Sequence, residues 1–443
     1  MSTTTKKKSD NVGRRVLHTG LAVGVVALVS AGALRMSPSM FAVSYLQPAA
    51  TSTPPSLQTE SAVPGVVHLP TPVPLRAIYM SQCAVGSLGF RKELVDFIKS
   101  SGLNAVVIDV KDYSGGIGFP TDDPALAPYV SKSCGAKDMQ EFVKELHADN
   151  IYVIARITVF QDPMYAKAHP ELAVKTKEGG VWKNYGGLAF IDVGARPFWD
   201  YIVELGRVAY RDIGFDELNF DYIRFPSDGN LADASFTLDA GTTKAEALEE
   251  FFRYLSAELK PSGVVLSADL FGYTTVHSDD LGIGQVLERA LPYFDYIDPM
   301  VYPSHYINGF DGIKNVNADP YDVVHYSLAQ AVLRAAQATT TVEALAETPI
   351  TRTVVVPATA TEATTTKEVA TGVYRKAVYP ASIIRPWLQG FDYPVVYTPE
   401  MVQAQIQATY DVGLQSYLVW DAANKYTALR QVLKENATTT AAN

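Results

Sequence analysis

The chain has 443 residues, of which 47% are hydrophobic and 19% are charged, and its formal net charge is −10. This length is enough for one large domain, or two smaller ones, with a well-filled core. An acidic chain argues against a nucleic-acid partner, whose phosphates it would repel, but not against a neutral polymer such as a glycan.

Residues 1–36 carry a pattern typical of export. Lysines and arginines between residues 6 and 15 precede an apolar stretch over residues 17–34, and Ala31-Gly32-Ala33 offers a cleavage site of small residues. The stretch is also close to the roughly 17–25 residues that a membrane span needs. We therefore expect either a cleaved signal peptide or a signal anchor that keeps the chain in the membrane. In both cases the rest of the protein is exported, and is either secreted or held at the cell surface.

The next segment, residues 37–73, is rich in Pro, Ser, Thr and Ala and predicts a flexible linker. We expect the folded domain over residues 74–434 and a disordered tail over residues 435–443. The chain has two cysteines, Cys83 and Cys134. In an exported protein they could form one disulfide, and two buried free thiols are the alternative. No CxxC pair or Cys–His cluster accompanies them, so a structural zinc site is not expected.

Strand-like and helix-like segments alternate after the linker. The predicted strands cover residues 76–80, 105–110, 151–160, 217–225, 264–271, 293–302, 382–388 and 416–420. The predicted helices cover residues 90–100, 138–149, 198–213, 244–260, 281–290, 321–337, 399–412 and 425–434. Eight such pairs predict a single-domain (β/α)8 TIM barrel. A doubly wound open sheet is the alternative, but the loop at residues 81–86 lacks its glycine-rich phosphate motif. A Thr-rich insertion at residues 339–371 is expected to be a surface loop or a β-hairpin.

Polar residues stand at the end of nearly every predicted strand, where a TIM barrel carries its active site. They are Asp109, Lys111, Asp112, Arg156, Thr158, Asn219, Asp221, Arg224, Ser267, Asp269, Asp298, Tyr302, His305, Arg385, Trp387, Gln389, Trp420, Asp421 and Asn424. A barrel that served only as a scaffold would not need so many. Because side chains alternate along a strand, carboxylates on neighbouring strands are expected to point into one barrel mouth.

The strand at residues 219–226 places Asp221 and Arg224 in an otherwise apolar run. Burying a charge costs several kcal/mol unless the charge is paired or used. The two residues could therefore be functional, or they could form a salt bridge that closes the barrel top, as Asp109 and Lys111 could. Asp298, which precedes Pro299, could instead shape a turn, and Trp387 and Trp420 could be core residues.

Two carboxyl groups in one mouth are what a glycosidase needs, because one attacks or stabilises the anomeric carbon and the other protonates the leaving oxygen. Crowding raises the pKa of one carboxyl, while Arg224 or Lys111 could keep the other ionised. No GxSxG or HExxH motif is present. Asp109, Asp221 and Asp269 could hold Mg²⁺ or Ca²⁺ together, but no ligand spacing singles them out, so we expect neither metal nor cofactor.

The segment FDYIRFP at residues 220–226 resembles the strand-four signature of a glycoside hydrolase family with a TIM barrel, long filed as a domain of unknown function. Three further segments are similar to that family and occur in the same order: VIDVKD at 107–112, SADLFG at 267–272 and DPMVYPSHY at 298–306. The resemblance covers about residues 74–426, and only the Thr-rich insertion departs from the family pattern.

The resemblance implies a glycosidase-like barrel in which Asp221 is the nucleophile or the stabilising carboxylate. The acid is then Asp269 or Asp298, and we prefer Asp269 because it lies on the neighbouring strand. The other predicted site residues are expected to bind substrate: Asp109, Lys111, Arg224, Tyr302, His305, Arg385, Trp387 and Trp420.

The sequence therefore predicts an exported glycoside hydrolase that acts on a cell-envelope or extracellular polysaccharide. The alternative is a surface-tethered glycan-binding protein on a degenerate barrel that has lost catalysis.

Overall fold

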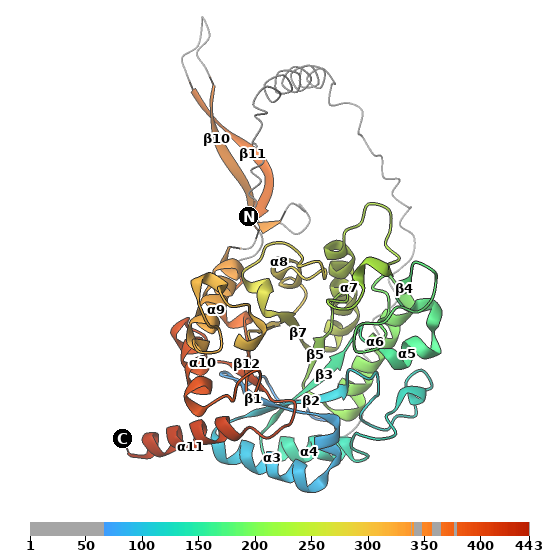
Figure 1. Ribbon diagram of the computed structural model, residues 1–443, viewed down its shortest axis with the longest axis vertical. Helices are drawn as coiled ribbons and strands as arrows, with labels where there is room; N and C mark the ends of the chain where they lie inside the picture. Colours follow the sequence, from blue (N-terminus) through green and yellow to red (C-terminus); the bar gives the residue numbers. More distant parts are fainter. Residues whose placement is uncertain (1–65, 338, 341–347, 357–364, 376–378, 443) are drawn as a thin grey trace, which may run out of the picture. The chain divides into compact units, whose positions relative to one another are not determined.

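The computed structural model describes residues 66–337, 339–340, 348–356, 365–375 and 379–442 (Figure 1). The predicted export segment, and most of the predicted linker, lie outside these residues. No helix within the described part of the chain is both long enough and apolar enough to cross a membrane.

Eight parallel strands close into a barrel, which confirms the predicted fold class. In order around the barrel they are β1 (Arg76–Met80), β2 (Ala105–Lys111), β3 (Tyr152–Thr158), β5 (Glu217–Asp221), β7 (Val265–Phe271), β8 (Tyr296–Met300), β12 (Trp387–Gln389) and β13 (Tyr417–Trp420), which pairs with β1. Each of them overlaps a predicted strand, although β12 shares only Trp387 and Leu388 with the strand predicted at residues 382–388. The strands are buried on both faces, as parallel strands covered by helices are, and every residue of β2 is buried.

Helices follow the strands along the chain. They are α3 (Leu88–Ser101), α4 (Met139–Ala148), α6 (Arg196–Val208), α7 (Lys244–Leu259), α8 (Leu287–Ala290), α9 (Pro320–Ala336), α10 (Pro399–Asp411) and α11 (Thr427–Ala442). The prediction of a helix over residues 281–290 is wrong except for its last turn, α8. Leu281, Gly282 and Gly284 have φ values of 53°, 69° and 85°, in the left-handed region, which excludes a right-handed helix there.

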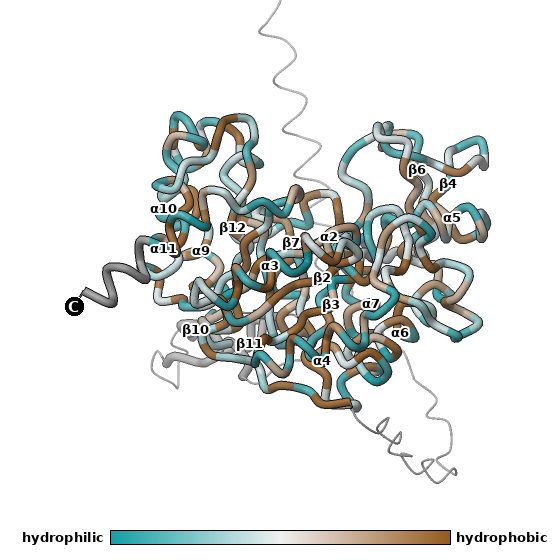
Figure 2. The backbone as a smooth tube through the Cα atoms, turned by 90° about the horizontal axis from the view of Figure 1, so that it is seen from below, coloured by the Kyte–Doolittle hydropathy of each residue, from teal (hydrophilic) through white to brown (hydrophobic). Residues whose placement is uncertain are grey.

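Hydrophobic side chains fill both the space around the barrel and its interior. The larger core lies between strands and helices and includes Ile108, Leu218, Leu266 and Val419. A separate cluster fills the barrel and includes Tyr79, Val107, Ile154, Trp387 and Leu418. Figure 2 shows the hydrophobic segments concentrated toward the middle of the tube trace. The barrel is therefore filled with side chains and is not an open channel.

Residues 66–73, which we expected in the linker, already contact the first residues of the barrel strands. The backbone N–H of Leu69 donates to Asp216 Oδ1 over 2.7 Å, and the hydroxyls of Thr71 and Tyr152 lie 3.0 Å apart. The ring of His68 stacks on Tyr210 with 3.9 Å between centroids. These contacts are made by single side chains, so the composition of the segment did not reveal them.

The Thr-rich insertion forms a β-hairpin, one of the two expected outcomes. Strand β10 (Thr348–Val356) pairs antiparallel with β11 (Thr365–Arg375), which also pairs with the two-residue β9 (Thr339–Thr340). Runs of Thr and Val favour this structure because branched side chains suit a strand.

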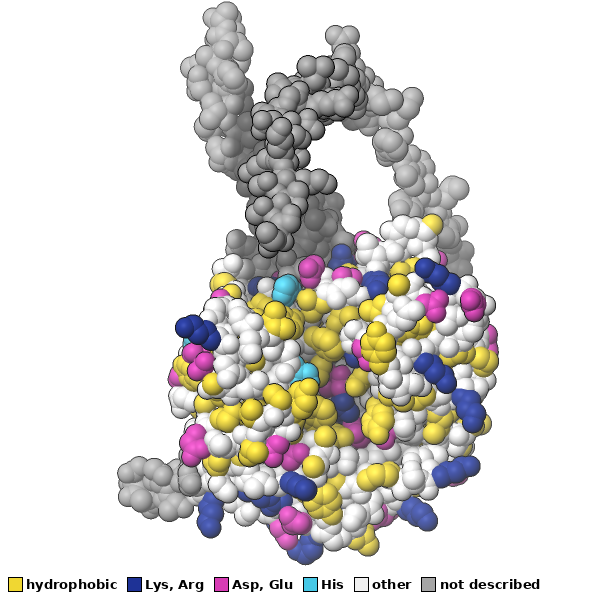
Figure 3. All heavy atoms as spheres, in the orientation of Figure 1, with side chains coloured by type: hydrophobic (Ala, Val, Ile, Leu, Met, Phe, Trp, Pro, Cys, Tyr) yellow, Lys and Arg dark blue, Asp and Glu magenta, His cyan; other side chains and the backbone are white. Residues whose placement is uncertain are grey.

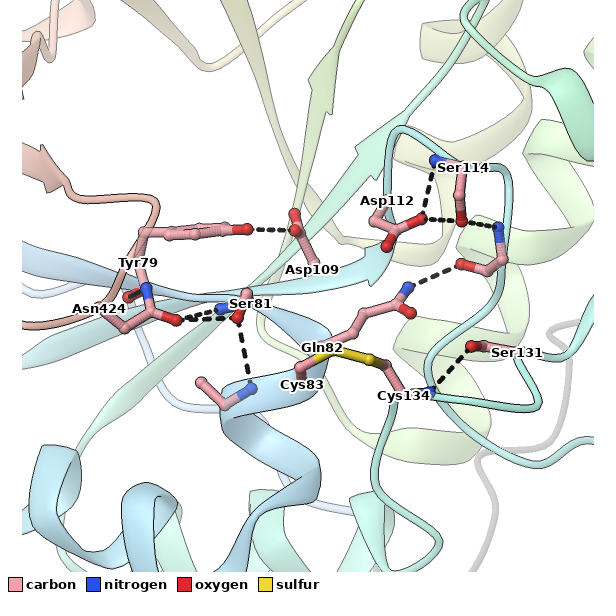
Figure 4. Close-up of a disulfide and its surroundings, with 12 residues drawn as sticks. Tyr79, Ser81, Gln82, Cys83, Asp109, Asp112, Ser114, Ser131, Cys134 and Asn424 are labelled. Atoms are coloured by element: carbon pink, nitrogen blue, oxygen red, sulfur yellow. Dashed lines mark hydrogen bonds between the residues drawn. A yellow bond between two sulfur atoms is a disulfide. The ribbon is translucent and has the colours of Figure 1, made fainter. Parts of the chain in front are cut away.

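Cys83 and Cys134 form a disulfide, with 4.6 Å between their Cα atoms. The bond joins the short helix α2 (Gln82–Gly86), which follows β1, to the loop after β2 (Figure 4). The backbones approach closely here, since a Cβ on Gly135 would lie 2.4 Å from the carbonyl oxygen of Gly118. Only glycine fits at Gly135, and its φ of 104° points to the same requirement.

Candidate active site

Three of the predicted carboxylates surround one guanidinium group at the C-terminal ends of neighbouring strands. Arg156 on β3 donates to Asp109 on β2 over 2.5 Å and also donates to Asp221 on β5. Its Nε lies 3.7 Å from Oδ2 of Asp269 on β7. We call these four residues the carboxylate cluster. The three carboxylates are 3%, 5% and 1% exposed, respectively, so their charges interact through little solvent.

Strand register explains why these side chains meet. Asp109 pairs with Arg156, and Thr158 on the same strand pairs with Asp221. Because side chains alternate, Asn219 and Asp221 point into the barrel, while Leu218 and Phe220 pack in the core outside it. The prediction that strand-end carboxylates share one mouth is therefore confirmed for Asp109, Asp221 and Asp269.

Asp221 is the last residue of β5, which is shorter than predicted. The next residue, Tyr222, has a φ of 52°, a left-handed conformation that ends the strand. Its backbone N–H donates to Asp221 Oδ1 over 2.5 Å, while Oδ2 accepts from Arg156. Two donors on one carboxyl group, one of them charged, stabilise a carboxylate at this position.

Asp269 has the opposite environment. Its Oδ1 accepts hydrogen bonds from Asn219 over 2.9 Å and from the Trp387 indole over 2.7 Å, while its Oδ2 lies 3.7 Å from Nε of Arg156. Burial, together with the negative charges of Asp221 and Asp298, raises the pKa of Asp269 well above its ordinary value, against the opposing effect of Arg156. The cluster therefore pairs an ion-paired carboxylate with a carboxyl group that tends to stay neutral.

Asp109 is held from two sides. The phenol of Tyr79 donates to Oδ2 and Arg156 donates to Oδ1, and Figure 4 shows the Tyr79 ring directed at this carboxyl group. Burial raises the pKa of Asp109, while Arg156 and Tyr79 oppose that rise. Tyr79 thus fixes the outer edge of the carboxylate cluster.

The predicted site residues Asp298 and Arg385 lie inside the barrel rather than at its mouth. Arg385 donates to both oxygens of Asp298, over 3.0 and 2.8 Å, and to Glu217 over 2.5 Å, and all three side chains are fully buried. Burial raises the pKa of Asp298 to about 6, against the lowering effect of Arg385. Asp298 is committed to an ion pair with Arg385 inside the barrel, which does not fit the role of acid, and the paired Arg385 does not fit that of a substrate-binding residue.

Lys111 does not reach the carboxylate cluster either. Its Nζ lies 2.9 Å from Asp162 and donates to the Thr158 carbonyl over 2.6 Å, and its side chain is fully buried. A register shift between Asp109 and Lys111 accompanies this placement. The predicted role in substrate binding does not fit, because the charge is already neutralised inside the protein.

Aromatic side chains lie beside the carboxylate cluster. The ring of Tyr302 lies 5.5 Å from Trp420, 5.6 Å from Phe391 and 5.4 Å from His305, and the Trp420 ring lies 6.2 Å from Tyr79. The structure thus brings together the predicted residues Tyr302, His305 and Trp420. Figure 3 shows a hollow near the centre of the visible face, bordered by hydrophobic side chains with acidic, basic and histidine side chains among them.

Arg224 is close to Asp221 in sequence but does not pair with it. Its guanidinium lies between the rings of Tyr222 and Phe271, and Asp221 is paired with Arg156 instead. The alternative of an Asp221–Arg224 salt bridge is therefore wrong.

Arg156, Asn219, Tyr79 and Phe391 were not assigned roles from the sequence. The first two stood among the late-strand polar residues, which was the available signal. Tyr79 and Phe391 carried no signal, because aromatic residues are common in cores as well as in sites.

Within the described residues, no group of three or more His, Cys, Asp or Glu side chains could hold a metal ion. Asp109, Asp221 and Asp269 surround a guanidinium group, which occupies the place between them.

Comparison with solved structures supports the fold. The glycoside hydrolase domain of PgaB (BpsB) from Bordetella bronchiseptica is similar with a TM-score of 0.52 and 13% identity, over 82% of this chain and 99% of that one. A hypothetical protein from Ruminiclostridium thermocellum ATCC 27405 is 34% identical over 46% of this chain and 98% of its own, with a TM-score of 0.40. No protein with a curated description matches the sequence.

The sequence pattern of one domain family matches residues 77–346 and 351–426, which together make up most of the chain and include all of the barrel strands except Arg76, the first residue of β1. That family is described as "putative glycosyl hydrolase domain". The chain therefore belongs to this glycosyl hydrolase family.

Proposed function

We propose that the protein is an exported glycoside hydrolase that cleaves a cell-envelope or extracellular polysaccharide, with Asp221 and Asp269 as its catalytic pair. The carboxylate cluster is the observation that carries the proposal. Asp221 accepts from Arg156 and from a backbone N–H, while the pKa of its neighbour Asp269 is raised. Two carboxyl groups in such different environments match the division of labour in glycoside hydrolysis.

The chemistry would proceed as follows. The glycosidic C–O bond breaks as the proton of the Asp269 carboxyl group passes to the leaving oxygen. The positive charge that develops at the anomeric carbon is stabilised or captured by the carboxylate of Asp221. Water then supplies the hydroxyl of the product, and its remaining proton returns to Asp269. Arg156 holds Asp221 in place throughout, and Tyr79 and Asp109 hold Arg156.

The aromatic side chains beside the carboxylate cluster would bind the sugar. Tyr302, Trp420 and His305 lie together beside the carboxylate cluster, and ring faces suit the apolar faces of a pyranose. Asp109 would also accept hydrogen bonds from sugar hydroxyls through the lone pairs that Tyr79 and Arg156 do not use.

Export is proposed on two grounds. The basic and apolar residues 1–36 match a signal peptide or anchor. The disulfide between Cys83 and Cys134 is of a kind that persists in oxidising compartments. Uncleaved, the N-terminal segment would hold the enzyme at the cell surface.

A second candidate is a glycan-binding protein without catalysis, and the 1% exposure of Asp269 favours it, because an acid must reach the leaving oxygen. Measuring binding and cleavage on the same polysaccharides separates the two. The hydrolase loses turnover in the Asp221→Asn variant by at least ~10²-fold while remaining folded. The binding protein shows saturable binding without cleavage, and the substitution leaves its affinity nearly intact.

A further inference from the structure

Arg224 is a buried cation with no acidic partner in the described part of the chain. Its side chain is 7% exposed. Three other buried cations of the barrel are each paired: Arg156 with Asp109 and Asp221, Arg385 with Glu217 and Asp298, and Lys111 with Asp162. Arg224 makes one hydrogen bond, from Nη1 to the carbonyl of Phe225 over 3.0 Å.

Aromatic rings take the place of a counter-ion around this guanidinium. Its carbon lies 4.7 Å from the ring centre of Phe271, 4.9 Å from Tyr222 and 5.9 Å from Phe190. Rings of this kind orient a guanidinium and partly stabilise its charge. They do not satisfy its N–H donors, of which an arginine has five.

The unused donors of Arg224 reach the surface. None of the nitrogens of this side chain is both buried and without a hydrogen-bond partner. Since, among the described residues, only the Phe225 carbonyl accepts from Arg224, the remaining donors retain contact with solvent. The nearly buried guanidinium therefore keeps hydrogen-bond donors that are accessible to solvent and have no partner in the described protein.

The electrostatics of Arg224 differ from those of its paired neighbours. Burial lowers the pKa of Arg224, and Tyr222, Asp221 and Asp228 only partly offset this effect. Burial acts on Arg156 and Arg385 too, but their paired carboxylates outweigh it and raise their pKa values. Arg224 is thus the cation whose desolvation is left without a matching negative charge.

The position of Arg224 places it beside the proposed catalytic pair. It follows Asp221 by three residues, and its ring neighbours Tyr222 and Phe271 lie at the ends of β5 and β7, the strands that carry Asp221 and Asp269. An anionic group bound by Arg224 would therefore belong to the same glycan whose glycosidic bond lies at the carboxylate cluster.

We propose that Arg224 binds an anionic group of the glycan, a carboxylate or a phosphate, so that the substrate is an acidic polysaccharide. This inference rests on the proposed function, because it places the anion on the substrate of that site. The planar fork of a guanidinium matches both oxyanions, and aromatic walls hold the fork in one orientation. Arg224 is a specificity-determining residue whose missing counter-charge is supplied only when the anionic polymer is bound.

Calorimetric titration of the full-length protein tests the anion site. The probes are sodium glucuronate, glucose 6-phosphate, inorganic phosphate and glucose, the last being the uncharged control. We expect at least one anionic sugar to bind about 10-fold or more tightly than glucose. Arg224→Gln removes that preference, and Arg224→Lys retains part of it, since lysine keeps the charge without the fork. Arg430→Gln is the matched control: Arg430 also lies over an aromatic ring, that of Phe97, but on the helix α11.

The titration of the wild-type protein tests the anion site even if a variant does not fold. If both anionic sugars bind no more tightly than glucose, the proposal is overturned. Preference for glucuronate assigns a carboxylate, and preference for glucose 6-phosphate assigns a phosphate. Binding of free phosphate alone, with no sugar preference, also overturns it, because the anion would not belong to a glycan.

Cleavage assays separate this proposal from the glycosidase proposal. The substrates are an acidic polysaccharide and the same polymer after chemical reduction of its carboxyl groups. An anion preference that depends on Arg224, without cleavage of any polymer, supports the anion site and contradicts the hydrolase. Equal cleavage of both polymers by wild type and Arg224→Gln supports the hydrolase and contradicts the anion site.

Discussion

Arg156 is the side chain that allows three carboxylates to share one end of the barrel. It contacts Asp109, Asp221 and Asp269 through different nitrogens of one guanidinium. Removing one partner of a buried ion pair is far more costly than the net value of the pair, because the other charge stays buried without compensation.

Replacing Arg156 by Met is therefore expected to destabilise the protein by about 3–5 kcal/mol and to abolish activity. The loss of stability should shrink as the pH falls, because protonation neutralises the carboxylates that the substitution leaves unpaired. Urea unfolding of wild type and variant between pH 4 and pH 8 measures both effects. The stability of Arg156→Lys, which keeps the positive charge, should lie between those of wild type and Arg156→Met. A difference in unfolding free energy between wild type and Arg156→Met that grows as the pH falls would contradict this explanation.

Asp269 sets the expected pH dependence of the reaction. As the acid it must be protonated, so kcat/KM should fall as the pH rises through the raised pKa of Asp269, at a pH above the ordinary aspartate range. The native state also holds this proton more tightly than the unfolded state. The free energy of unfolding should therefore decrease as the pH rises through the folded pKa, and Asp269→Asn should remove that part of the dependence.

A pH–rate profile with parallel unfolding experiments checks both statements. A rate that rises steadily from pH 5 to pH 9 would exclude Asp269 as the acid.

The sequence identified strand-end polarity but not the depth of each side chain. Alternation correctly grouped Asn219, Asp221 and Asp269, because parity along a strand is a local property. It did not reveal that Asp298 and Arg385 lie lower in the barrel, where they pair with Glu217. Depth depends on the stagger between strands, and the register shift at Lys111 depends on tertiary packing.

Among the secondary-structure elements, α2 is tied to the loop after β2 by the disulfide, next to Tyr79 and Asp109 at the edge of the carboxylate cluster (Figure 4). The two cysteines are 51 residues apart. A loop of that length corresponds to about 4 kcal/mol in the chain-entropy treatment, at the upper end of the typical ~2–4 kcal/mol.

We expect the Cys83→Ser/Cys134→Ser variant to lose about 2–4 kcal/mol of unfolding free energy. Thermal or urea unfolding of this variant and of wild type, with and without reductant, measures the loss. Reductant should destabilise wild type and leave the variant unchanged. Equal stability of the two proteins under oxidising conditions would contradict a structural role for the bond.

The elements show where sequence patterns suffice. All eight barrel strands were predicted, because each is a short run of apolar, branched or aromatic residues bounded by polar ones. The helix expected at residues 281–290 was reduced to α8 by the left-handed backbone at Leu281, Gly282 and Gly284. The early start of the folded part, at residues 66–73, depends on contacts with Asp216 and Tyr152 that are distant in sequence.

For the protein as a whole, family membership and the barrel establish a glycosyl hydrolase scaffold, and the carboxylate cluster supplies the proposed chemistry. Helices and the hydrophobic core support the barrel, so that charged groups can be held close together at its mouth. The sequence predicted this division between scaffold and site, but not Arg156 as the centre of the site.

Release of reducing ends from a polysaccharide panel tests the central claim most directly. The assay compares wild type with Asp221→Asn, Asp269→Asn and the surface control Asp96→Asn, which alters an exposed pair with Lys92 on α3. We predict release by wild type and the control, and a loss of at least ~10²-fold in both cluster variants, with folding retained. Release by Asp221→Asn at the wild-type rate would contradict the proposed catalytic pair.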